Sequence, residues 1–151
     1  MLNNEQVADK LNSLLGTLRD GEKGFAEAAE HVNDAQLKSL FTERSGQRAT
    51  LAHEVEAKIT ALGEKPRDGG SVSAALHRGW INVRDAVTGR DDSQVVAEVE
   101  RGEDVAVDNY QDVLGESELP ADLRVFVEGQ YAKIKASHDE IRDLKHGMKS
   151  A

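Results

Sequence analysis

Five ionisable residues lie on helix faces that are otherwise apolar in the sequence. They are Glu22, Arg44, Arg48, Glu103 and His138. Charged side chains are seldom buried unless they pair with an opposite charge or bind a metal. Carboxylates and an imidazole can ligate a metal ion, whereas arginine only donates hydrogen bonds and keeps its positive charge. The five residues therefore pose a choice between a metal centre and an internal salt-bridge network.

Two long amphipathic helices are expected to position the first three of these residues. Apolar residues recur at three- and four-residue steps over 4–32 and again over 35–62. Because the break between the two segments is short, we expect antiparallel neighbours. Glu22 lies as far before that turn as Arg44 lies after it. We therefore predict that Glu22 lies within hydrogen-bonding reach of Arg44 or Arg48.

The second half of the sequence predicts three more helices. A short amphipathic one covers about 71–88 and contains Trp80, the only tryptophan. Two long ones follow, over about 94–114 with Ser93 as N-cap, and from Pro120 to about 148. Glu103 lies about as far before the turn between these two long helices as Gln130 lies after it, so we expect the two residues to be level. His138 lies nearly two helical turns further along the last helix.

This order of helices indicates an all-α protein with one domain over residues 1–151. Two antiparallel hairpins are joined by a long crossover that carries the additional short helix. A four-helix bundle with one long crossover is the ferritin-like arrangement. We expect the short helix to dock on its own bundle, with Trp80 buried inside the monomer, because so short a helix is marginal alone.

Di-iron bundles place one Glu on each of two helices and a Glu-x-x-His motif on each of the other two. Glu22 and Glu103 suit the single-Glu positions. Level with Glu22, however, the second helix has Arg44 where a Glu is needed and Gln47 where a His is needed. The sequence therefore favours a buried polar network without metal. Its predicted members are Glu22, Arg44, Arg48, Glu103, Gln130 and His138.

Composition excludes several classes of function. The net charge of −9 disfavours binding to nucleic acid and to anionic membranes. The chain has no cysteine, which excludes disulfides and thiol chemistry. No stretch approaches the roughly 18–20 apolar residues of a membrane span, and the first residues lack the pattern of a signal peptide. We therefore expect a cytoplasmic protein.

Several short motifs resemble those of one family when their order is considered together. They are residues 20–25 in the first helix, Arg44 and Arg48 with residues 51–54 in the second, 77–80 in the crossover, 98–103 with Tyr110, and Gln130 with 137–139. In these motifs the chain resembles a family of uncharacterised bacterial ferritin-like four-helix-bundle proteins, a domain of unknown function. The resemblance implies a ferritin-like fold without an established activity. It also implies that Glu22, Glu103 and Gln130 correspond to ligand positions of ferritin-type sites.

Three hypotheses of function follow. The first is a non-enzymatic, cytoplasmic bundle with no catalytic residues and no cofactor, self-associating as a homodimer or larger assembly, with a stress-associated role suggested by fold analogy alone. The second is a metal-binding or oxidase-type protein that holds iron or manganese through Glu22, Glu103, Gln130 and His138. The third is a partner-binding scaffold that uses the Trp80 helix.

Overall fold

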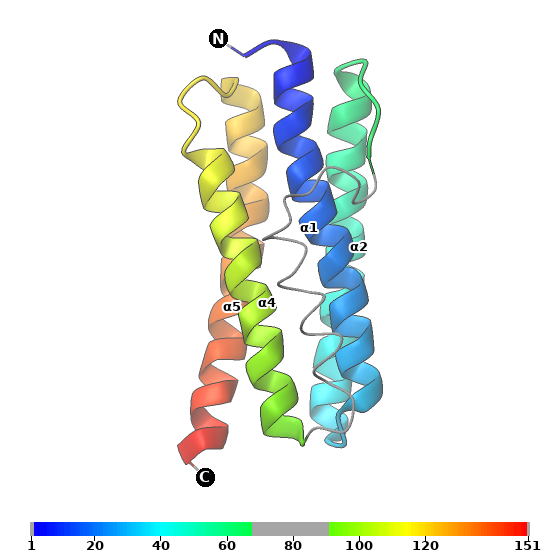
Figure 1. The fold of residues 1–151 in the computed structure, drawn as a ribbon, viewed down its shortest axis with the longest axis vertical. Coiled ribbons are helices and arrows are strands. Elements are labelled where there is room, and N and C mark those ends of the chain that lie inside the picture. The colour runs from blue at the N-terminus through cyan, green and yellow to red at the C-terminus, as the bar shows by residue number, and fades with distance from the viewer. Residues whose placement is uncertain (1, 68–90, 151) are drawn as a thin grey trace.

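The computed structural model describes residues 2–67 and 91–150, and in these ranges the secondary structure is helical. The helices are α1 (Asn4–His31), α2 (Ala35–Ala61), α4 (Asp92–Leu114) and α5 (Ala121–Ser150). They lie side by side as a bundle (Figure 1). None of them is long and apolar enough to cross a membrane.

The direction of the chain defines the topology. α1 and α2 form one antiparallel hairpin, α4 and α5 form another, and α1 also packs against α4. α2 ends at the end of the bundle opposite to the one where α4 begins (Figure 1). The predicted all-α bundle of two hairpins joined by a long crossover is thus confirmed. The crossover helix predicted at about 71–88, with Trp80, lies outside the described residues, so its docking stays a prediction.

Side-chain caps fix where the helices begin. Asn3 caps α1 and forms a reciprocal capping box with Gln6. Asp34 caps α2 by accepting the first backbone N–H groups of that helix. The N-cap of α4 is Asp91, which forms a capping box with Gln94, and not Ser93 as predicted. Ser93 instead donates its hydroxyl to the Asp91 carboxylate at 2.8 Å.

The first turn of α4 is also tied to the α1–α2 turn. The Asp92 carboxylate accepts the backbone N–H of Asn33 at 2.8 Å and that of Asp34 at 2.9 Å. Two backbone donors outside helical ladders are satisfied in this way. The contact fixes how the second hairpin sits against the first.

The apolar core has two parts, stacked along the bundle axis. One cluster extends along α1 from Val7 to Leu18 and includes Leu51, Tyr110 and Ile134. The other begins on α1 at Phe25 and includes residues of the remaining described helices: Phe41, Val95, Val99 and Ile141. In sequence the two clusters are separated by about two turns on α1, α4 and α5 and by nearly three turns on α2. What fills that gap is polar.

Candidate functional site

The gap between the two apolar clusters is filled by what we call the central polar layer, made of Arg44, Arg48, Glu103 and Ser137. On α2 it lies between Phe41 and Leu51, on α4 between Val99 and Ala106, and on α5 between Ile134 and Ile141. Helix periodicity places these residues on the same inward faces as the apolar residues around them. α2, α4 and α5 therefore interrupt their apolar faces at one common level.

An ion pair forms the centre of this layer. Nη2 of Arg48 lies 2.7 Å from Oε1 of Glu103, and both side chains are completely buried. The Arg48 nitrogens and Oε1 of Glu103 have no hydrogen-bond partner among the described residues. The contact is therefore electrostatic in the main. Complete burial strengthens the attraction and also removes the hydration of both charges.

Ser137 links this pair to Arg44. Its hydroxyl donates to Oε2 of Glu103 at 2.6 Å and accepts from Nε of Arg44 at 3.0 Å. Arg44 extends outward, where it also pairs with Glu43 at 2.6 Å and Glu140 at 2.9 Å. One chain of polar contacts thus leads from the surface of the bundle to its centre.

α1 contributes an aromatic face and a glycine to the surroundings of Arg48. The Phe25 ring centroid lies 5.1 Å from Cζ of Arg48, within the range of a cation–π contact. Gly21 lies against the same side chain, since a Cβ built on it would be 3.4 Å from Nη1 and 3.5 Å from Cγ. α1 therefore contacts the buried guanidinium without offering it a carboxylate.

The predicted contact of Glu22 with Arg44 or Arg48 is wrong. Glu22 is 35% exposed in its side chain and pairs with Arg19 of the same helix at 3.0 Å. Arg19 also binds Glu56 of α2 at 2.9 Å. The reason is rotational: neighbouring helical residues are 100° apart, and Gly21, not Glu22, is the residue that faces Arg48.

Gln130 belongs to a separate network nearer the first apolar cluster. The Tyr110 hydroxyl donates to Oε1 of Gln130 at 2.8 Å. The Gln130 amide donates in turn to the Leu51 carbonyl at 3.1 Å and to the Glu54 carboxylate at 3.2 Å. Burial raises the pKa of the Tyr110 hydroxyl far above its ordinary value of 10.0, so the phenol stays protonated.

His138 lies at the edge of the bundle, away from Glu103. Its Nε2 lies 2.5 Å from Asp104 and its Nδ1 lies 3.0 Å from Asp139. Burial alone would lower the pKa of His138, but hydrogen bonds to Asp139 and Asp104 outweigh it, and the pKa lies above 6.5. The bond from His138, followed by one from Lys135, lowers the pKa of Asp139 to about 2.

Of the six residues predicted to form one network, Arg44, Arg48 and Glu103 are thus brought together. Glu22, Gln130 and His138 each have other partners. Ser137, which joins Arg44 to Glu103, was not among the predicted members. Helical spacing does place Ser137 on the inward face, because residues 134, 137 and 141 follow steps of three and four.

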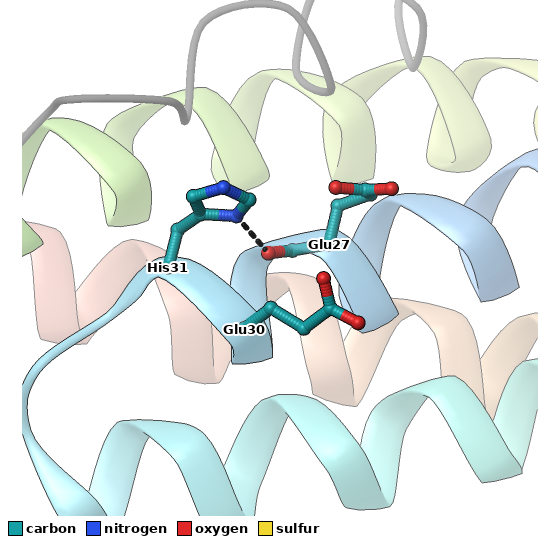
Figure 2. A group of neighbouring side chains, drawn as sticks. All are labelled: Glu27, Glu30 and His31. Carbon is teal, nitrogen blue, oxygen red and sulfur yellow. Dashed lines mark hydrogen bonds between the residues drawn. The ribbon is translucent and has the colours of Figure 1, made fainter.

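Two groups of potential metal ligands occur among the described residues. One consists of Glu100, Asp104 and His138, on α4 and α5. The other consists of Glu27, Glu30 and His31, which all belong to the end of α1 (Figure 2). In the second group, Nδ1 of His31 lies 2.8 Å from the backbone oxygen of Glu27.

Comparison with known proteins places the fold in a wider context. Residues 6–116 match the model of a family described as Domain of unknown function (DUF2383). No functionally curated protein matches the chain. Among solved structures, a dodecameric thioferritin, the bacterioferritin-related protein from Bacteroides fragilis, is similar with a TM-score of 0.69 and 16% identity. The similarity covers 99% of this chain and 91% of the thioferritin chain, and at that identity it concerns the fold alone.

Proposed function

The chain belongs to the family described as Domain of unknown function (DUF2383), and from this premise we propose that it is a non-enzymatic bundle of ferritin-like fold. In this proposal the Arg48–Glu103 ion pair stands where ferritin-type bundles hold a metal centre. The observation that supports it is the complete burial of this pair at the common break of the apolar faces. Because neither side chain of the pair is exposed among the described residues, we assign the pair a structural role.

The donor set of the central polar layer does not fit iron or manganese. These ions need several carboxylate or imidazole ligands in one place. The layer contains one carboxylate, and Arg48 and Ser137 contact its two oxygens. The guanidinium of Arg48 cannot lose its charge and repels a divalent cation. The other residues of the metal hypothesis, Glu22, Gln130 and His138, have separate partners and do not converge on Glu103.

The role of the ion pair in this proposal is to fix how the two hairpins pack. Arg48 comes from the first hairpin and Glu103 from the second. A shift of one helix by a turn would leave both charges buried and unpaired, at a large cost in free energy. Buried polar groups can in this way select one packing arrangement, even where they add little net stability.

Metal analysis tests this proposal. Protein produced in medium supplemented with iron and manganese is washed with buffer and analysed for both elements, beside the Glu103→Ala variant. We expect no stoichiometric iron or manganese that depends on Glu103. One tightly held ion per chain in the parent, lost in Glu103→Ala, would overturn the proposal and favour the oxidase-type alternative.

We also propose that the chain self-associates, because the structurally similar thioferritin is a dodecamer. A stress-associated role remains an analogy of fold. Size-exclusion chromatography with light scattering across a range of protein concentrations measures the assembly. A mass of about one chain at all concentrations would contradict self-association without affecting the proposal for the ion pair.

A further inference from the structure

The edge where α4 meets α5 collects metal-ligand side chains outside the central polar layer. Glu100 and Asp104 lie one helical turn apart on α4, and His138 of α5 lies beside them. One potential ligand atom from each side chain lies within 4.8 Å of the others. One imidazole nitrogen with two carboxylate oxygens is a donor set that zinc and related divalent ions accept.

His138 is oriented as metal-binding histidines are. Such residues usually donate one ring N–H to a carboxylate, which aims the other ring nitrogen at the ion. The Nδ1 atom of His138 lies 3.0 Å from Oδ1 of Asp139, and Nε2 faces Asp104. We propose that Glu100, Asp104 and His138 bind a divalent transition-metal ion of the zinc type, with Asp139 orienting the imidazole.

The geometry allows an ion to enter with small side-chain movements. Zinc lies about 2.0–2.2 Å from nitrogen and oxygen ligands, so neighbouring ligand atoms in a tetrahedral site are roughly 3.3–3.5 Å apart. Nε2 of His138 and Oδ1 of Asp104 are 2.5 Å apart and would have to separate by about 1 Å. The Asp104 side chain is 55% exposed, which opens the site to solvent and leaves room for water as a further ligand.

Lys145 competes with this ion for the Glu100 carboxylate. Its Nζ lies 2.7 Å from Oε2 of Glu100, and its side chain is 26% exposed. Unlike the completely buried Arg48, it is a partly solvated side chain that can turn away when an ion arrives. Removal of the Lys145 charge is therefore expected to strengthen metal binding, which a purely structural role for Glu100 would not predict.

The second group of potential ligands provides a matched control. Glu27, Glu30 and His31 also combine two carboxylates with one histidine, but all three come from one helix (Figure 2). Nδ1 of His31 lies beside a backbone oxygen, whereas Nδ1 of His138 lies beside a side-chain carboxylate. Loss of His31 should leave zinc binding at the α4–α5 edge unchanged.

Calorimetric titration with zinc chloride tests the proposal on the full chain, without an affinity tag and after removal of metal by a chelator. We expect one strong site per chain. His138→Ala should weaken zinc binding at least tenfold. Asp139→Asn should weaken it about tenfold, the usual effect of losing a residue that orients a metal ligand. Lys145→Gln should make zinc binding tighter. His31→Ala should bind as the parent does. Circular dichroism establishes that each variant is folded, and Asp104→Asn replaces His138→Ala if the latter does not fold.

The outcomes that contradict the proposal are equally specific. No zinc binding tighter than millimolar in the parent would overturn it, as would binding that survives both His138→Ala and Asp104→Asn. Binding lost in His31→Ala but kept in His138→Ala would place the ion at the end of α1. Because the site lies outside the central polar layer, none of these results depends on the function proposed for the Arg48–Glu103 pair.

Discussion

Arg48 of α2 and Glu103 of α4 meet across the two hairpins, with Nη2 and Oε1 2.7 Å apart and neither side chain exposed. Other buried polar contacts follow the same pattern. The Asn109 amide of α4 donates to the Thr17 hydroxyl of α1 at 2.8 Å, and Gln130 of α5 donates to the Leu51 carbonyl of α2 at 3.1 Å. These three buried contacts thus join one hairpin to the other.

Replacement of one member of the Arg48–Glu103 pair should destabilise the protein far more than replacement of both. Arg48→Met or Glu103→Leu leaves one uncompensated buried charge, which costs about 3–5 kcal/mol. The double variant leaves apolar side chains of similar volume, and we expect a free energy of unfolding within about 1 kcal/mol of the parent, or above it. Denaturant unfolding followed by circular dichroism measures the free energies of unfolding of the parent, the two single variants and the double variant. Additive losses would mean that the two residues do not act as a pair.

Ser137→Ala should destabilise the protein by about 1–3 kcal/mol, because Oε2 of Glu103 then loses its buried donor. Ser45→Ala is the matched control on the half-buried side of α2. The Ser45 hydroxyl donates at 2.8 Å to the backbone oxygen of Glu22, so we expect a loss of about 1 kcal/mol or less. Chemical denaturation of the two variants compares them. Equal losses would show that Ser137 is not needed to satisfy Glu103.

Gly21→Ala should stabilise the protein slightly. Alanine is favoured over glycine inside a helix by about 0.5–1 kcal/mol, and the new Cβ would touch Arg48 at 3.4 Å without a clash. Gly46→Ala is the control, because a Cβ there meets nothing within 4 Å. Thermal melts of both variants show whether each substitution raises or lowers the melting temperature. A loss at Gly21 together with a gain at Gly46 would show that the space beside Arg48 does not accept a methyl group.

The N-cap of α4 predicts a specific pH dependence. The backbone N–H of Gln94, followed by the Ser93 hydroxyl, lowers the pKa of the Asp91 carboxyl below its ordinary value of 3.8. A lowered folded-state pKa stabilises the protein above the unfolded-state pKa, and this contribution is lost as the pH falls through the folded value. Titration of the carboxyl carbon by NMR should give a pKa below 3.8, which Ser93→Ala raises. A pKa at or above 3.8 in the parent would contradict the cap.

The helical pattern in the sequence predicted the described helices to within a few residues. Spaced apolar residues such as Val7, Leu11 and Leu18 define an inward face without reference to any partner helix. The beginning of α4 was placed two residues late, since Ser93 and Asp91 are both good N-caps. The reciprocal bonds between Asp91 and Gln94 distinguish them.

The partners of the polar residues depended on tertiary structure. Helical spacing indicated that Arg48 and Glu103 would be buried as charges in need of compensation. It could not say that Gly21 rather than Glu22 faces Arg48, or that Ser137 rather than His138 reaches Glu103. Adjacent helical residues differ by 100° in direction, and a helix can rotate by part of that angle with little change in its apolar face. Packing against the neighbouring helices fixes that rotation, and with it which charges meet.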